Sequence, residues 1–212
     1  MSGPTNPDRK LLKETRWSRR YQIDSYDVYE SKIAEDDEKL HLADVILEWE
    51  SWEIGERLEF VRAFSHKSSL SGEDERIVEF LINQKDERIL AMMALPAILH
   101  SNKDLVLEFL LRQIQSTTKD RVNFIHALTL LGDSRAVSVI RDVYQQGLER
   151  EFSSNERAVL DDETHDFMMA CIALWKLTGN QEYLTRLQVL QIHGNERIRR
   201  QANLLHKIWC QA

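Results

Sequence analysis

One helical phrase occurs twice in this chain, and it restricts the possible folds more than any other feature. Residues 124–133 read Phe-Ile-His-Ala-Leu-Thr-Leu-Leu-Gly-Asp, and residues 170–180 read Ala-Cys-Ile-Ala-Leu-Trp-Lys-Leu-Thr-Gly-Asn. In both places an apolar helix runs into a glycine, and a second amphipathic stretch follows at once. A period of roughly 20–50 residues is typical of stacked helix pairs, because one pair cannot bury its apolar face alone. The phrase therefore predicts an α-solenoid.

The composition agrees with an all-α fold. Glycine and proline are scarce, at 7 and 3 of 212 residues, which argues against a β-sandwich or a loop-rich fold. Apolar residues make up 42% of the chain, enough for a sizeable core. We predict a right-handed α-α superhelix of about five helix pairs. Its ten helices are expected over residues 37–51, 55–67, 73–84, 86–100, 103–115, 119–131, 134–149, 162–178, 181–192 and 195–210.

The predicted repeat region covers residues 36–212, and residues 1–35 form an N-terminal arm or cap that is partly disordered. The helix at 86–100 is apolar nearly all round, so it is expected in the centre of the stack, and its proline should kink or break it. Residues 150–161 interrupt the rhythm as one long insertion. Helix N-caps are expected at Ser71, Asp120 and Asn195.

Charge is distributed unevenly along the chain. The formal net charge is −7, but residues 1–23 hold six basic and two acidic side chains, so the remainder carries −11. An acidic body is a poor match for a phosphate backbone, which supplies most non-specific affinity for nucleic acid. The sequence therefore argues against nucleic acid as the partner and favours a protein with a basic surface.

No apolar run approaches the roughly 18–20 residues that a membrane helix needs, and the basic N-terminus lacks the apolar segment of a signal peptide. The two cysteines are Cys171 and Cys210. Cys171 lies on the apolar side of a predicted helix, where a buried, reduced thiol is expected. These features predict a cytoplasmic protein without a membrane anchor.

A second pattern marks the start of the second helix in four of the pairs. An acidic residue stands there at intervals of 33, 46 and 30 residues, and arginine follows it in three places. The residues concerned are Glu87, Asp120, Asp166 and Glu196, with Arg88, Arg121 and Arg197. Together with the Ala-Leu…Leu-Gly phrase, this pattern resembles HEAT repeats, in particular the short bacterial kind seen in phycobilisome-lyase relatives. The resemblance covers roughly residues 36–210 and is best at 119–147.

The resemblance implies an architecture rather than one activity, since HEAT-like proteins include scaffolds, chaperones, lyases and glycosylases. Within it, one acid-histidine cluster is dense enough to suggest a metal site: Asp161, Asp162, Glu163, His165 and Asp166. Acids that complement the dipole of a helix N-terminus explain this cluster better. The histidines have no repeated metal-ligand spacing. We therefore expect no metal and no cofactor.

Other routes to catalysis find little support in the sequence. There is no glycine-rich phosphate loop and no Gly-x-Ser-x-Gly elbow. Cys171 has no electropositive neighbour in sequence that would lower its pKa. Trp175 and Trp209 are expected to be packing residues, and His126 a histidine at the edge of the core.

The leading functional prediction is a non-catalytic, protein-binding adaptor or inhibitor that uses the concave face formed by the second helices. In this class, an acidic cytoplasmic protein could neutralise a basic toxin or nuclease as an immunity protein. The residues predicted to line that face are Asn123, His126, His165, Asp166, Arg199, Arg200 and Asn203. A second binding element is predicted in the N-terminal arm, at Arg16, Trp17, Arg19 and Arg20, because arginine and aromatic residues dominate interface hot spots. Docking of this arm on the protein's own acidic body is equally consistent with the sequence.

Two alternatives stay open. The first is a HEAT-type enzyme, a lyase or a DNA-base glycosylase-like protein, with a groove site near His126, Trp175 and the acids of 161–166. The second is a structural subunit that self-associates through Trp209 and the last helix. A deep apolar pocket would favour the enzyme, and a broad charged concavity would favour protein binding.

Overall fold

The computed structural model describes residues 42–65, 67–117, 120–148, 162–193 and 195–210. Over these ranges the chain is helical with no strand, which confirms the prediction of an all-α fold there. The helix predicted at 162–178 coincides with α9 at both ends. The elements are α2 (Leu42–Trp49), α3 (Ile54–Ser65), α4 (Gly72–Leu81), α5 (Glu87–Ala97), α6 (Lys103–Ser116), α7 (Arg121–Leu131), the 3₁₀ turn η1 (Ser134–Ala136), α8 (Val137–Leu148), α9 (Asp162–Thr178), α10 (Gln181–His193) and α11 (Glu196–Cys210).

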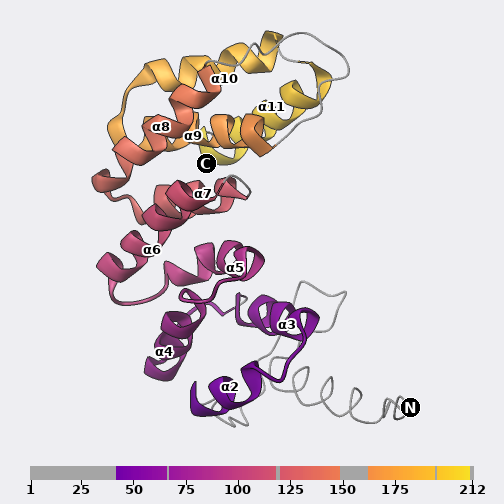
Figure 1. Ribbon diagram of the computed structural model, residues 1–212. Helices are drawn as coiled ribbons and strands as arrows, with labels where there is room; N and C mark the ends of the chain where they lie inside the picture. Colours follow the sequence, from indigo (N-terminus) through magenta and orange to yellow (C-terminus); the bar gives the residue numbers. More distant parts are fainter. Residues whose placement is uncertain (1–41, 66, 118–119, 149–161, 194, 211–212) are drawn as a thin grey trace, which may run out of the picture.

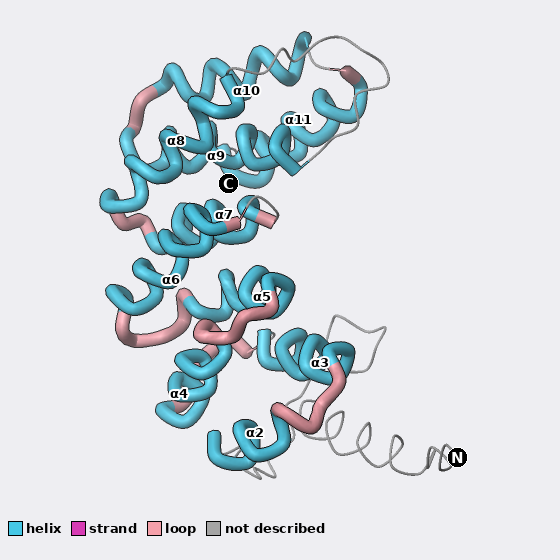
Figure 2. The backbone as a smooth tube through the Cα atoms, in the orientation of Figure 1, coloured by secondary structure: helices cyan, strands magenta, loops and turns pink. Residues whose placement is uncertain are grey.

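The helices lie in two rows along an elongated stack, with α2 at one end and α10 and α11 at the other (Figure 1). In what we call the odd row, α3 packs on α5, α5 on α7, α7 on α9, and α9 on α11. The even row contains α2 against α4 and α6 against α8. Successive helices also pack across the rows, and short loops join most of them (Figure 2). None of these helices has the length and apolar character needed to cross a bilayer.

Side chains at the helix starts account for several boundaries. Ser71 caps α4 in a capping box: its Oγ accepts from the Asp74 amide at 3.2 Å, and its own amide donates to the Asp74 carboxylate at 2.9 Å. Asn195 caps α11, since its Oδ1 accepts from the Ile198 amide at 3.0 Å. Both predictions are confirmed. The prediction for Asp120 is wrong, because this residue has a left-handed backbone (φ 55°) and makes no side-chain cap bond.

Glycine ends the two helices that carry the repeated phrase. Gly132 and Gly179 both have a φ of 72°, a left-handed conformation that favours glycine. Their amides close the last turns of α7 and α9 by donating to the carbonyls of Leu128 and Trp175, at 3.1 and 2.8 Å. Pro96 does not kink a longer helix. Instead, α5 ends at Ala97, one residue after the proline, and does not continue to residue 100.

Carboxylates join the starts of the even-row helices. The Leu42 amide, at the start of α2, donates to Glu73 of α4 at 2.6 Å. On the other side of α4, Glu75 accepts from the backbone amide of Ser101, at 2.7 Å, and from its hydroxyl, at 3.0 Å. Free amides at a helix start are satisfied in this way by a neighbouring helix instead of by water.

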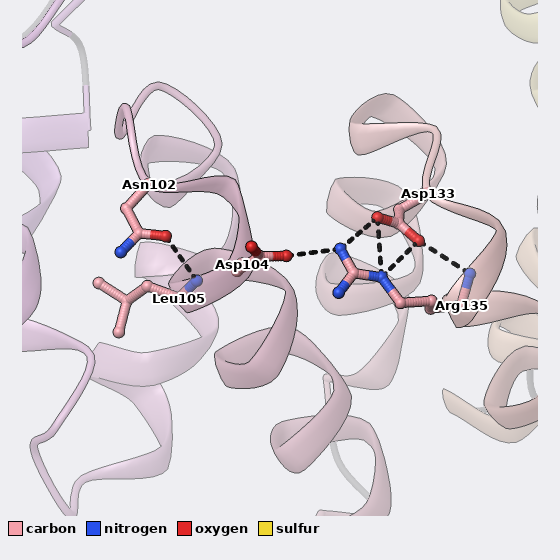
Figure 3. Close-up of polar contacts among 5 residues, drawn as sticks. All are labelled: Asn102, Asp104, Leu105, Asp133 and Arg135. Atoms are coloured by element: carbon pink, nitrogen blue, oxygen red, sulfur yellow. Dashed lines mark hydrogen bonds and ion pairs between the residues drawn. The ribbon is translucent and has the colours of Figure 1, made fainter.

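The same pattern continues between α6 and α8 (Figure 3). Arg135 Nη2 lies 2.7 Å from a carboxylate oxygen of Asp104, in the first turn of α6, and 2.7 Å from one of Asp133, which caps η1. Asn102 caps α6 beside them by accepting from the Leu105 amide at 3.1 Å. We call the contacts of Glu73, Glu75, Asp104, Asp133 and Arg135 the polar edge.

The most enclosed helix is α9, in which every residue from 166 to 174 is buried. It packs against α7, α8, α10 and α11, so no side of it faces solvent along this stretch. Gly147 of α8 allows the closest approach, because a Cβ there would lie 2.7 Å from both Cβ and Cγ of Phe167. The sequence predicted this enclosed position for the helix at 86–100, but Leu95 on α5 and Leu99 just after its end are exposed.

Candidate functional site

The residues predicted for the concave face lie on three odd-row helices. Asn123 and His126 are on α7, His165 and Asp166 on α9, and the remaining three on α11. Because α9 packs against both α7 and α11, the structure brings parts of this set together. Their environments nevertheless differ sharply.

Asp166 is buried, with 2% of its surface exposed, and neither carboxyl oxygen has a hydrogen-bond partner in the structure. Burial raises its pKa to about 7, and Asp162 and Glu163 act in the same direction. Arg121 and the Val122 amide at the start of α7 oppose the shift, although that amide falls short of full hydrogen-bond geometry. The prediction that Asp166 contacts a partner does not fit this burial.

His165 is half-buried and contacts α11. Its Nε2 lies 2.9 Å from the side-chain nitrogen of Gln201, and because an amide nitrogen only donates, the imidazole nitrogen accepts. Desolvation lowers the pKa of His165, while the charge of Asp162 works against that change. The neutral ring with its proton on Nδ1 is therefore the favoured form at pH 7.

His126 packs against the last helix. Its ring lies edge-on to Trp209, with 4.9 Å between the centroids and 75° between the planes. Burial lowers the pKa of His126. Trp209 is partly buried against the core, which confirms the prediction that it is a packing residue. Trp175, which the enzymatic alternative places beside His126, has its ring next to the ammonium group of Lys176, at 5.2 Å.

The α11 residues do not all face the same way. Gln201 points to His165, whereas Asn203 accepts a hydrogen bond from Gln191 of α10 at 3.1 Å. Residues two apart on a helix lie on nearly opposite sides, so Asn203 is turned away from α9. Arg200 is exposed and forms an ion pair with Glu196 one turn earlier. The predicted set is therefore not one continuous patch.

Two predicted elements lie outside the described residues: the arm with Arg16, Trp17, Arg19 and Arg20, and the insertion at 150–161 together with Asp161. Among the residues that are described, no group of three or more histidine, cysteine or acidic side chains is placed to hold a metal ion. Cys171 is buried and not in a disulfide, and burial raises the pKa of its thiol.

A set of exposed apolar residues escaped the sequence analysis. In the odd row, α5 and α7 each have a row neighbour on both sides and even-row helices behind them. We call the remaining side of the row the open face. Exposed large apolar side chains on or next to these helices are Leu95 on α5, Leu99 in the turn after it, Leu130 on α7, and Leu204 and Ile208 on α11.

The sequence did contain a signal for the α11 part of this set. Leu204 precedes Leu205, and Ile208 precedes Trp209, so the apolar stripe of α11 is wider than one contact can cover. The structure buries Leu205 and part of Trp209, and it leaves 50% of Leu204 and 54% of Ile208 exposed. Adjacent apolar pairs on a helix therefore indicated a second apolar face.

The two ends of the described chain carry net charges of opposite sign. Residues 42–100 contain twelve acidic and six basic side chains, a net charge of −6. Residues 181–210 contain two acidic and five basic side chains, a net charge of +3. The stack is therefore acidic at its α2–α5 end and basic at its α10–α11 end.

Comparison of the chain with protein-family models, with curated proteins and with solved structures finds no match. The resemblance to HEAT repeats therefore stays a prediction from the sequence motifs.

Proposed function

We propose that this protein is a non-catalytic, protein-binding adaptor or inhibitor built as a HEAT-like, right-handed superhelix. The succession of contacts along the odd row supports this architecture, because each helix packs on the second one after it in the chain. Among the described residues, a row of this kind presents one long side that no other helix covers. Such a surface suits a macromolecular partner better than a small substrate.

One observation carries the proposal: large apolar side chains are exposed on neighbouring helices of the odd row. Exposed apolar residues that gather on one side of a molecule mark interaction sites, whereas singly scattered ones need no explanation. Leu95 lies two residues before the end of α5, and Leu99 lies in the turn that follows it. Leu130 continues the series on α7, which packs directly against α5.

The partner proposed for the α5 part of this face is a protein with a basic surface. The net charge of −6 over residues 42–100 would attract it, and electrostatic steering would speed the encounter. An immunity-type inhibitor of a basic toxin or nuclease is one member of this class. The charge distribution favours a contact on α2–α5 over one around Arg199 and Arg200, which the sequence analysis had suggested.

The test is affinity capture from the native lysate with quantitative mass spectrometry. The wild type is compared with Leu95→Glu/Leu99→Glu and with Val189→Glu/Ile192→Glu, a matched double change at exposed apolar residues of α10. We expect a basic protein to be captured by the wild type and by the α10 variant, and to be lost with Leu95→Glu/Leu99→Glu. Equal capture by all three, with circular dichroism confirming that each is folded, contradicts the proposal.

The enzymatic alternative has one favourable observation, the pKa of about 7 for Asp166 beside His165. A carboxyl that titrates near neutral pH suits general acid-base catalysis. It ranks second because a group with 2% of its surface exposed cannot meet a substrate in this conformation.

A further inference from the structure

Helix α2 is apolar on two sides, and the described chain covers only one of them. Leu42, Val45 and Trp49 lie at helical spacing and pack into the core, where the last two have no exposed surface. Ile46 and Leu47 lie on the other side, and 46% and 83% of their surfaces are exposed. No other large apolar side chain of the described residues is as exposed as Leu47. A helix that is apolar all round is normally buried on all sides.

The position of α2 explains why this side is uncovered. It lies at one end of the described stack, and its principal packing partner is α4 (Figure 1). The ring of Trp49 contacts Trp52, Phe60 and Phe80, so these contacts all belong to the buried side. The end of a stacked helical array needs a polar outer surface or a cap to stay soluble. A further element is therefore expected to cover the apolar side of α2.

The charges around α2 are mainly acidic. Residues 42–57 contain five acidic side chains and one basic one, Arg57, and α4 contains four acidic and one basic. Glu50 directly follows α2 and has 87% of its side chain exposed, with Arg57 3.8 Å away. Lys67 offsets one acid of α4 through its ion pair with Asp74 at 2.7 Å. A net negative charge remains, which favours an occupant that combines basic with apolar side chains.

The chain has a segment of this kind shortly before α2. Residues 16–21 read Arg-Trp-Ser-Arg-Arg-Tyr, with three basic, two aromatic and no acidic side chains. The 20 residues 22–41 connect this segment to Leu42. A flexible linker of that length spans roughly 25 Å, whereas a helix of eight residues such as α2 is only about 12 Å long. Linkage of this kind gives effective concentrations in the millimolar range, which favours the internal segment over a separate molecule.

Charge also excludes the rest of the region before α2 from this role. Residues 24–38 contain seven acidic side chains and one lysine. The acidic side chains of α2 and α4 would repel them, because like charges that are brought together destabilise a contact. Only residues 16–21 combine aromatic side chains with the complementary charge.

We propose that residues 16–21 dock on the uncovered side of α2, with Trp17 and Tyr21 against Ile46 and Leu47. The arginines of the segment then lie among the acidic side chains of α2 and α4. Tryptophan, tyrosine and arginine are the residues that contribute most to protein contacts of this size. The inference goes beyond the proposed function, since it concerns a contact within the chain. It also chooses between the two roles that the sequence left open for the arm, in favour of docking on the protein's own body.

The experiment is photo-cross-linking of the full-length protein with a benzophenone amino acid in place of Trp17, which keeps a bulky aromatic side chain there. After irradiation at low protein concentration, mass spectrometry of the digested monomer should find cross-links to residues 43–50. Ile46→Glu/Leu47→Glu should lower the yield of these cross-links at least roughly tenfold. Arg19→Glu/Arg20→Glu should also lower the yield, and more at low salt than at high salt, because salt screens exposed charges.

Two controls make the result specific. Val189→Glu/Ile192→Glu, a matched double change on α10, should leave the yield unchanged, and circular dichroism checks that every variant is folded. A mixture of isotope-labelled and unlabelled protein shows whether a cross-link lies within one molecule or joins two. We expect cross-links within one molecule.

Three results overturn the inference. The first is cross-links that join labelled and unlabelled molecules, because a second copy would then cover α2. The second is cross-links that end in residues 24–38 instead of α2. The third is a yield that Ile46→Glu/Leu47→Glu does not change in folded protein. The capture experiment at Leu95 and Leu99 is independent of all three, so the proposed function is tested separately.

Discussion

The carboxylates at the polar edge and the carboxyl of Asp166 are the same chemical group, but they differ in burial and in hydrogen bonding. At the edge, Asp133 is exposed to water and receives hydrogen bonds from the side chain and the amide of Arg135, which lower its pKa. Asp166 has lost its water and has no hydrogen bond in return, so burial raises its pKa to about 7. The difference teaches that the donors and water around an acid, rather than its place at a helix start, decide its charge.

The two regions also differ in how tightly their side chains are packed. The polar edge lies at the starts of the even-row helices, where the side chains of Arg135 and Asp104 are exposed to water. Around Asp166, α9 is covered on all sides, and Phe167 fills the space that the missing side chain of Gly147 leaves. Changes at this junction should therefore cost more than changes at the edge.

The largest effect is expected from Asp166→Asn. Below pH 3.8 the acid is protonated in both folded and unfolded protein, so it contributes nothing. Between 3.8 and about 7 only the folded protein keeps the proton, and wild-type stability falls as pH rises. The pKa difference corresponds to about 4 kcal/mol, reached above about pH 7. An amide cannot ionise, so the variant should lack this fall.

Urea denaturation at several pH values measures this effect. The difference in unfolding free energy between Asp166→Asn and the wild type should grow in favour of the variant from about pH 4 to about pH 8. Asp142→Asn, at an exposed residue of α8, is the control. Parallel stability curves for the wild type and Asp166→Asn would show that the carboxyl is solvated or partnered in solution.

A smaller loss is expected from Gly147→Ala. Alanine favours a helix over glycine by about 1 kcal/mol, but the new Cβ would overlap Phe167, which should leave a net destabilisation of about 2 kcal/mol. Gly55→Ala in α3 is the matched control, because a Cβ there meets nothing within 4 Å. Chemical denaturation should show opposite signs for the two variants. A stabilised Gly147→Ala would mean that α8 and α9 are further apart than described.

The smallest effect is expected from Arg135→Ala at the polar edge. The ion pairs of Arg135 with Asp104 and Asp133 are exposed, and water and salt screen them. Thermal melting should show a slight loss at low ionic strength that disappears at high salt, and Arg141→Ala on α8 provides the background. A loss of stability that persists at high salt would show that the polar edge contributes to the stability of the fold by more than exposed ion pairs.

Local signals predicted much of the fold. The glycines after the repeated phrase ended α7 and α9, and Ser71 and Asn195 capped their helices, because each effect depends on a few neighbouring residues. The prediction that Asp120 caps α7 was wrong, and nothing in the sequence indicated this. Its backbone is left-handed, and its side chain makes no cap bond at the start of α7.

The candidate site was predicted less well. The sequence placed His126, His165 and Asp166 together on the face of the second helices, and the structure does bring α7, α9 and α11 into contact. It did not foresee that Trp209 would pack on His126 or that α9 would enclose Asp166. Both outcomes depend on contacts between residues far apart in the chain, and the periodicity of apolar residues does not predict such contacts.

The all-helical character of the described residues and most helix boundaries could be predicted from the sequence, because apolar spacing, caps and glycines act within one or two turns. Which apolar and ionisable side chains are left exposed followed instead from how the helices pack on one another. Burial depends on how many helices surround a residue, and so Asp166 lies enclosed while Leu204 and Ile208 remain at the surface. The apolar residues that stay exposed form the proposed binding face.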